Sequence, residues 1–324
     1  MISIRICEDI DECRFLWEHF WPTECIFDLW PVRYCFAEAY DRQPYFIIAE
    51  NNGIIQGILP LSWIDEEQYY GYFPGETCQG KTWLEQNRIP AKNFHVTEEL
   101  LLSIPGPAHL RYLTNIFLPA YYDNDIFNID ETGYLFLPGA HNYSMENYLQ
   151  QFSGKTRKKL KHELSRLEAF GVSYRHDNIG DVEYLYRLNQ HAFGGQSYFS
   201  SSRFLRSFEN LVSWLNAKGM LRVTTSLIGG KIAAVDIGAV WGMSYVVLAG
   251  GTHPDFQGVA KLINLHHMEW ACEQHFEAVD FLCGDFGWKE RFHLEPRPLY
   301  EIRISEEQVA WHEPVFEESI ACVQ

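Results

Sequence analysis

The sequence has few basic residues for its length. Its 324 residues include 26 Lys and Arg against 43 Asp and Glu, which gives a formal net charge of −17 at pH 7. A surface of this charge repels polyanions, so broad non-specific binding of nucleic acid is excluded unless the basic residues gather in one patch.

Long apolar runs are also missing. A membrane-spanning helix needs about eighteen or more consecutive apolar residues, and the sequence contains no such stretch. The first residues, MISIRICEDIDEC, lack a basic start followed by an apolar core. We therefore expect a soluble, cytoplasmic protein with no membrane insertion.

Cysteine and histidine occur without the spacings of a disulfide framework or a metal site. No C-x-x-C pair is present, so we expect reduced and mostly buried thiols. His266 and His267 are adjacent and would point about 100° apart on a helix, which rules out an i,i+4 zinc pair. We expect no metal ion. The eight cysteines are Cys7, Cys13, Cys25, Cys35, Cys78, Cys272, Cys283 and Cys322.

Apolar and aromatic residues, in contrast, are plentiful. The hydrophobic content is 47% and the aromatic content 15%, with ten Trp and eighteen Tyr. This is ample for sizeable cores in two ordinary domains. Tyr and Trp combine an apolar face with a polar group, so their abundance also favours a ligand groove.

One structural plan occurs twice along the chain. Residues 45–75 and 220–251 each contain three apolar strands, with a tight Gly-containing turn after the first. Both patterns predict a three-stranded antiparallel meander. Each is preceded by a predicted helix, one over roughly residues 29–40 and one capped by Ser201 and Ser202 and ending at Gly219. The repetition indicates two related domains that join near residues 138–145.

The halves differ after the meander. In the second half, the loop THPDFQG leads into the helix VAKLINLHHMEWACEQH and the strand AVDFLCG, a β–α–β unit. The first half has no clean helix directly behind its third strand. A glycine ahead of a helix N-terminus allows the backbone to approach a phosphate. The loop at Gly258 is therefore a candidate anion site, although a plain turn remains the alternative.

A second candidate anion site is the helix predicted over residues 153–171. Cations crowd its first turns, where they oppose the helix dipole and typically cost a few tenths of a kcal/mol each. An anionic partner would reverse this cost, whereas the alternative is a solvated basic face. The cations are Lys155, Arg157, Lys158, Lys159 and Lys161.

Carboxylates in and after the second-half strands are candidates for acid–base chemistry. Asp236 and Asp280 lie within apolar strands, where burial would raise the pKa of a carboxyl group toward the range of a general base. Asp285 follows the last of these strands, at a position where open α/β sheets present ligand-facing groups. The alternative for each is a structural carboxylate bonded to backbone or Tyr. Lys289 is a candidate to neutralise an acid or hold a substrate.

Two further residues of this region have weaker chemical cases. Cys283 has no His partner evident in the sequence, so we do not expect a nucleophile there. Tyr245 is expected in the core or the wall of a groove and is kept as a candidate catalytic residue.

The order of segments resembles a known family. The basic helix SGKTRKKLKHELSRLE, the helix SSSRFLRSFENL, the meander KIAAVDIGAVWGMSYVVLAGGTHPDFQG, and DFLCGDFGWKERF before PLYEIRI are similar to GNAT-type acyltransferases. The likeness is to the FemAB-like and cellulose-biosynthesis-associated acetyltransferases. It implies an α+β fold with tandem GNAT-like domains, each a mixed, mainly antiparallel sheet flanked by helices. The implied units are a degenerate domain over 1–140, an acyltransferase domain over 141–312 and a tail over 313–324.

The resemblance also implies a donor site. Acyl-CoA, including acetyl-CoA, would lie against the strand through Ala249, Gly250 and Gly251. The loop Gln257, Gly258, Val259, Ala260 and Lys261 would bind its pyrophosphate, with Arg157 and Lys158 as further contacts. The family pattern Q/R-x-x-G-x-G/A has Asp255 at its first position here.

The implied reaction is transfer of the acyl group to an amine. Asp236 or Asp285 would take the amine proton, and Lys289 would position the acceptor, which is a small molecule, an aminosugar or a polysaccharide precursor. FemAB-like relatives often lack the full loop and use aminoacyl-tRNA, so this donor stays open beside acyl-CoA. A non-catalytic ligand-binding protein with a duplicated fold is the third alternative. The sequence does not encode the oligomeric state.

Overall fold

The computed structural model describes residues 2–114, 127–284 and 287–305. Its amino-terminal half follows one sequence of elements. These are β1 (Ser3–Cys7), α1 (Ile10–Phe20), α2 (Trp30–Tyr40), β2 (Pro44–Asn51), β3 (Ile54–Ile64), β4 (Tyr69–Tyr72), α3 (Phe94–Leu102) and β5 (Ala108–Leu113).

The carboxy-terminal half repeats this order, which confirms the predicted duplication. Its elements are β7 (Val172–His176), α6 (Val182–Phe193), α7 (Ser202–Ala217), β8 (Leu221–Ile228), β9 (Lys231–Trp241), β10 (Ser244–Thr252), α8 (Val259–Glu273) and β11 (Ala278–Asp280). The long loop 73–93 separates β4 from α3, so the first half has no helix directly behind its third strand, as expected.

Local capping explains where the predicted helices begin. α5 (Gly154–Glu168) starts where the side chain of Ser153 accepts a hydrogen bond from the backbone N–H of Thr156. Ser201 caps α7 in the same way through Phe204. Such caps satisfy amides that have no partner inside the helix. α8 begins instead at Gly258, whose φ of +93° favours glycine.

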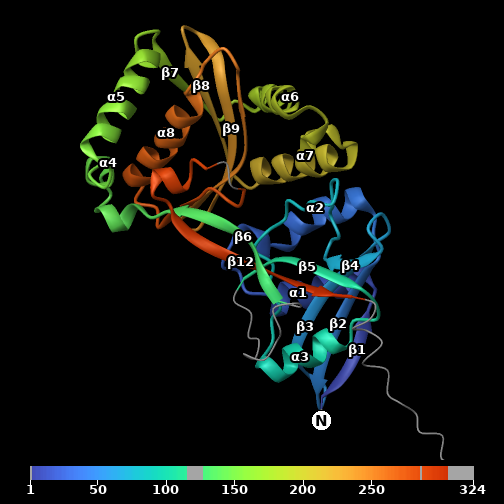
Figure 1. The fold of residues 1–324 in the computed structure, drawn as a ribbon. Coiled ribbons are helices and arrows are strands. Elements are labelled where there is room, and N and C mark those ends of the chain that lie inside the picture. Colours follow the sequence, from blue (N-terminus) through green and yellow to red (C-terminus); the bar gives the residue numbers. More distant parts are fainter. Residues whose placement is uncertain (1, 115–126, 285–286, 306–324) are drawn as a thin grey trace, which may run out of the picture.

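Two strands join the halves into one sheet. β6 (Phe127–Phe136) and β12 (Glu295–Ile304) pair antiparallel with each other, while the far end of β12 pairs with β5 and the last residues of β6 pair with β11. The twelve strands run in the order β1-β2-β3-β4-β5-β12-β6-β11-β10-β9-β8-β7. Figure 1 shows β6 and β12 crossing between the two lobes. The predicted join at 138–145 falls in η2 (Pro138–His141) and near α4 (Met145–Leu149), beside this crossing and not at a break in the sheet.

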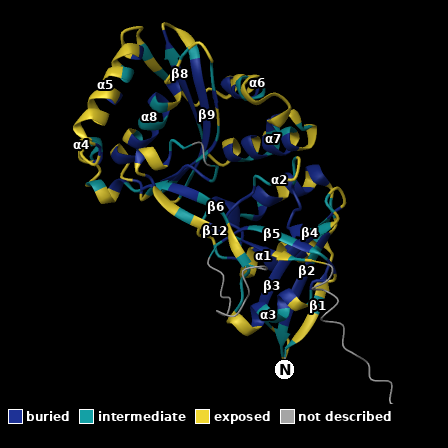
Figure 2. Ribbon diagram, in the orientation of Figure 1, coloured by how far each residue is buried: buried dark blue, intermediate teal, exposed yellow. Residues whose placement is uncertain are grey.

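The lobes also share a hydrophobic core between α2 and α7. Phe36 and Phe204 meet edge to face with ring centroids 5.8 Å apart. Arg206 donates a hydrogen bond to the carbonyl of Ala39 over 2.8 Å. Figure 2 shows buried residues along both helices at this junction, whereas the outer surface of α5 is exposed.

β9 has two differently covered faces because side chains alternate along a strand. Val235, Ile237 and Ala239 belong to the core that also holds residues of α6 and α7. Asp236 points to the opposite face, toward α8, where it meets His267. Tyr245 of β10 is fully buried and lies over Gly238. In the described part of the chain, no helix has both the length and the apolar composition needed to cross a bilayer.

We predict that Gly238→Ala destabilises the fold. A Cβ atom at this position would lie 2.3 Å from a ring carbon of Tyr245, so the buried ring must move. Overpacking of this kind typically lowers the free energy of unfolding by about 1–3 kcal/mol. Urea denaturation measures the loss. Gly154→Ala at the start of α5 is the control, because no atom lies within 4 Å of its added methyl group.

Candidate functional site

The site begins where β10 and β11 separate. The two strands pair in parallel only at Ser244, Tyr245 and Val246, opposite residues 278–280. On its other side, β10 has an irregularity against β9 between Val247 and Ala249. A bulge of this type redirects the backbone. Beyond Val246, the edge of β10 that faces β11 therefore has no strand partner among the described residues.

A cavity of about 580 Å³ lies at this separation. Residues 247–250 of β10 and the residues Ala260, Ile263 and Asn264 of α8 line one part of it. The amino-terminal half supplies another part through residues 81–85, and the remaining lining residues include Arg111, Tyr112, Glu131, Tyr198, Cys283 and Lys289. Both halves of the chain therefore build the cavity.

Asp236 lies beneath β10 in this cavity. Its Oδ2 is 3.0 Å from Nε2 of the buried His267 on α8. A Cβ atom on Gly250 would lie 2.4 Å from Oδ1 of Asp236, so the missing side chain at Gly250 is what leaves room for the carboxylate. The sequence placed Asp236 correctly in a strand, but it gave no sign that His267 is its partner.

The other predicted β10 residues divide between the cavity and the core. Ala249 and Gly250 line the cavity. Gly251 faces α6, where a Cβ atom would come within 2.9 Å of the carbonyl oxygen of Leu185. Tyr245 is not among the lining residues; its ring packs edge to face on Trp270. Its catalytic role stays a prediction.

Lys289 is held by the turn that follows β11. Its Nζ donates hydrogen bonds to the carbonyls of Phe281, Leu282 and Cys283 over 2.9, 2.8 and 2.7 Å. Burial lowers the pKa of this amine, while nearby acids including Glu85 oppose the shift. Asp285, its predicted partner, lies outside the described residues. The roles of both residues stay predictions.

A buried charge network joins the halves beside the cavity. Arg297 of β12 donates to both oxygens of Asp280, over 2.8 and 3.2 Å, and lies 3.6 Å from Glu85. Gln86 donates to Asp280 over 2.9 Å. Glu85 accepts from the backbone N–H of Cys283 over 3.0 Å. Burial, and then the charge of Asp280, raise the pKa of Glu85 to about 7.

The opposite wall is fixed around Tyr112. This residue has a φ of +54°, which is uncommon outside glycine. Its N–H donates to Asp130 over 3.1 Å and its hydroxyl to Glu131 over 3.3 Å, while the guanidinium of Arg111 lies 4.6 Å from the ring centroid. Leu282, also lining the cavity, has a φ of +58°. Strained backbone of this kind concentrates at functional sites.

The predicted phosphate loop faces two cavities. Gln257, Gly258 and Lys261 line an outer groove of about 960 Å³ between α5 and α8, whereas Ala260 lines the cavity at β10 and Val259 is buried. No partner is found for the backbone N–H groups of Gly258 and Ala260 in the described part of the chain.

Charged side chains around this groove have mixed roles. Lys261 is paired with Glu163 of α5. Arg157 and Lys158 are exposed on α5 and line neither cavity. The side chain of Asp255 is 80% exposed, which limits its electrostatic cost near an anion. Among residues 2–114, 127–284 and 287–305, no group of three His, Cys, Asp or Glu side chains is arranged to hold a metal ion.

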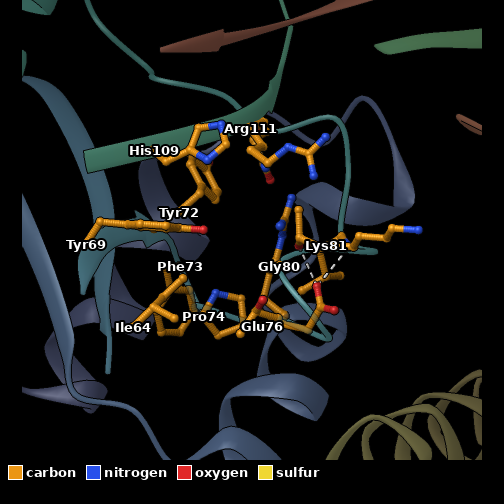
Figure 3. A pocket seen from close by; sticks show the side chains of 16 residues that line it. Ile64, Tyr69, Tyr72, Phe73, Pro74, Glu76, Gly80, Lys81, His109 and Arg111 are labelled. Atoms are coloured by element: carbon orange, nitrogen blue, oxygen red, sulfur yellow. Dashed lines mark hydrogen bonds between the residues drawn. The ribbon is translucent and has the colours of Figure 1, made fainter. Parts of the chain in front are cut away.

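The amino-terminal half has a matching strand pair with no comparable space. β4 and β5 also pair in parallel, at Tyr70 and Gly71. The loop 73–93 fills the region beyond them, and the remaining cavity measures about 30 Å³, room for about one water molecule. Figure 3 shows Glu76 of this loop reaching back into it, where the carboxylate binds Thr82 and the N–H groups of Trp83 and Leu84. A nucleotide-sized donor does not fit there.

The separated parallel strands, the bulge, the cavity and the glycine-initiated helix together define a GNAT-type acyltransferase fold. Residues 154–290 match the family model described as an acetyltransferase (GNAT) domain. The chain therefore contains a domain of this family, and the resemblance and fold class inferred from the sequence are confirmed.

Solved structures with the same overall fold cover nearly the whole chain. The crystal structure of FemX is 10% identical over 95% of this chain and 100% of its own, with a TM-score of 0.57. A conserved protein of unknown function from Bacteroides thetaiotaomicron VPI-5482 is 14% identical over 94% and 100%, with a TM-score of 0.56. L-PGS from Bacillus licheniformis is 11% identical over 92% of each chain, with a TM-score of 0.54. Comparison with curated protein sequences gives no match.

We predict that Arg297→Met strongly destabilises the protein. The change leaves Asp280 and Glu85 buried without their cation, and breaking a buried pair in this way typically costs about 3–5 kcal/mol of unfolding free energy. Urea denaturation at pH 8 tests this. Arg303→Met is the control on the same strand, because Arg303 is mostly exposed and its pair with Glu301 should contribute about 0–1 kcal/mol. Equal losses in both variants would contradict a structural role for the buried network.

Proposed function

We propose that the protein is an N-acyltransferase that moves an acyl group from acyl-CoA to an amine of a small molecule, an aminosugar or a polysaccharide precursor. The observation that supports this most directly is the separation of β10 from β11 at the bulge, which leaves backbone amides facing a cavity of suitable size. The GNAT domain match supports acyl transfer in general.

The donor half of the site consists mainly of backbone. Amides of β10 near Ala249 and Gly250 are placed to hydrogen-bond the donor carbonyl and to stabilise the oxyanion that forms on attack. The free N–H groups of Gly258 and Ala260, at the positive end of the α8 dipole, suit a pyrophosphate. The amine must attack in its neutral form, so a proton acceptor is required. Asp236 and Asp285 stay predictions for that role.

Aminoacyl-tRNA is the second candidate donor. The exposed cations at the start of α5 favour it, because they form a basic surface on a strongly acidic protein. Binding of tRNA that weakens steeply with added salt would support this donor, since each neutralised phosphate releases counterions. Acyl-CoA binding with no measurable tRNA binding would remove it.

We predict that Gly258→Ala weakens acetyl-CoA binding by about tenfold or more. Alanine is strained at a φ of +93°, by about 1–2 kcal/mol, and the loop must shift away from the geometry that presents its amides. Isothermal titration calorimetry measures the affinity. Gly230→Ala is the matched control: its φ is +77° in the hairpin between β8 and β9, and it lines neither cavity. It should lose stability but keep donor affinity.

Mass spectrometry of the reaction products decides the proposed function itself. The protein is incubated with acetyl-CoA and a panel of amino acids, aminosugars and polyamines. We expect a gain of one acetyl group on at least one amine. Tight binding of acyl-CoA without any transfer would instead favour the non-catalytic alternative.

A further inference from the structure

The amino-terminal wall of the cavity presents carboxylates whose charge is not matched by free cations. Glu85 and Glu131 line this wall. Of the lining cations, Arg111 is bonded to Asp130 and Glu131, and Lys289 uses its donors on three backbone carbonyls. Lys81 is exposed to solvent. A cationic group entering the cavity would therefore meet unneutralised acidic oxygens.

Aromatic rings complete the same wall. Tyr112 is locked by its hydrogen bonds to Asp130 and Glu131, and Tyr198 is tied to the carbonyl of Thr82 over 3.2 Å. Trp83 also lines the cavity. Aromatic faces attract cations, and this attraction strengthens where water is excluded. The wall thus combines carboxylates and aromatic rings, which is the chemistry that recognises an ammonium group.

Glu85 is the buried carboxylate of this wall, with 3% of the residue exposed. The groups that face it come from several elements: Asp280 on β11, Cys283 after β11, Lys289 beyond that turn and Arg297 on β12. Arg33 of α2 bonds to its backbone carbonyl and not to its carboxylate. Asp236, in contrast, lies beneath β10 on the α8 side and is held by His267.

We propose that this wall is the acceptor site, that it takes a cationic primary amine, and that the carboxylate of Glu85 accepts the proton that this amine loses. The inference rests on the proposed acyl transfer and names its acceptor class and its base. The amino-terminal half, which has no donor cavity of its own, then contributes the acceptor side of a shared site.

The reaction balances in protons and bonds. The ammonium gives one proton to Glu85 and becomes a neutral amine. Its nitrogen lone pair attacks the acyl carbonyl, forming the new C–N bond and an oxyanion at β10. As the oxyanion collapses, the bond to the donor sulfur breaks, and the second amine proton neutralises the departing thiolate. Glu85 finally releases its proton to solvent.

Two pH dependences follow from the raised pKa of Glu85. A base acts only when it is deprotonated, so transfer to a cationic amine should rise with pH through about 7. Because the folded pKa is higher than the ordinary value of 4.5, the protonated form stabilises the fold. That stabilisation is fully present below the ordinary value and is lost as the pH rises through about 7.

The test compares two kinds of nucleophile in the full chain, with acetyl-CoA as donor. Ethanolamine, lysine and glucosamine carry ammonium groups that need a base, whereas hydroxylamine is already neutral at pH 7. We expect Glu85→Gln to slow transfer to the accepted ammonium-bearing amine by about 100-fold or more, the usual contribution of a general base. Transfer to hydroxylamine should fall less than about fivefold. Asp236→Asn, the matched comparison, should keep the rise through pH 7.

Each other outcome contradicts a defined part of the account. Equal losses for both nucleophiles in Glu85→Gln would mean that Glu85 only holds the fold. A rise that persists in Glu85→Gln and disappears in Asp236→Asn would assign the base to Asp236. Transfer by the unsubstituted protein to hydroxylamine alone would overturn the cationic acceptor, while no transfer to any nucleophile would overturn the proposed function and this inference with it. Infrared spectroscopy gives an independent readout: a protonated carboxyl band should disappear near pH 7 and be missing in Glu85→Gln.

Discussion

The structure depends on two strands that belong to both halves of the chain. β6 and β12 pair with each other, and they connect β5 of the first half to β11 of the second. Without this ribbon the duplicated units would be separate sheets, each with two open edges. With it, the second-half strand separation faces the loop of the first half, and the space between them becomes a cavity lined by both.

The same ribbon explains the buried charges. Arg297 lies on β12, Asp280 on β11 and Glu85 on the loop of the first half, so the network forms only when all three segments meet. Burying such groups costs free energy unless they are paired and hydrogen-bonded, as they are here. Two nearly identical folds have therefore diverged in use. The loop 73–93 closes the strand pair of one half and contributes a wall to the site of the other.

Local features of the fold were predictable from the sequence because short-range rules govern them. The two meanders follow from Gly turns and alternating strands, and the helix starts at Ser153 and Ser201 follow from capping side chains. The glycine at the start of α8 and the strand position of Asp236 were also predicted. The insertion of β12 beside β5 was not, because nothing local to PLYEIRI encodes a partner so distant in the sequence.

The acceptor side of the site was missed for the same reason. Glu85 sits in a stretch without clear periodicity, and its contacts with Cys283 and Arg297 are visible only after folding. His267 was examined only as half of an adjacent His pair, and its bond to Asp236 crosses from a helix to a strand. Sequence patterns indicate elements and motifs, whereas the chemistry here arises where elements distant in the sequence meet.

The most direct measurement of the central claim is a crystal structure of the protein with a non-hydrolysable acetyl-CoA analogue. The account predicts the analogue's carbonyl oxygen within hydrogen-bond distance, about 2.7–3.2 Å, of a backbone nitrogen of β10 between Leu248 and Gly250. Its pyrophosphate should lie at Gly258 and Ala260. An analogue bound away from the separation of β10 and β11, or none bound at saturating concentration, would contradict the account.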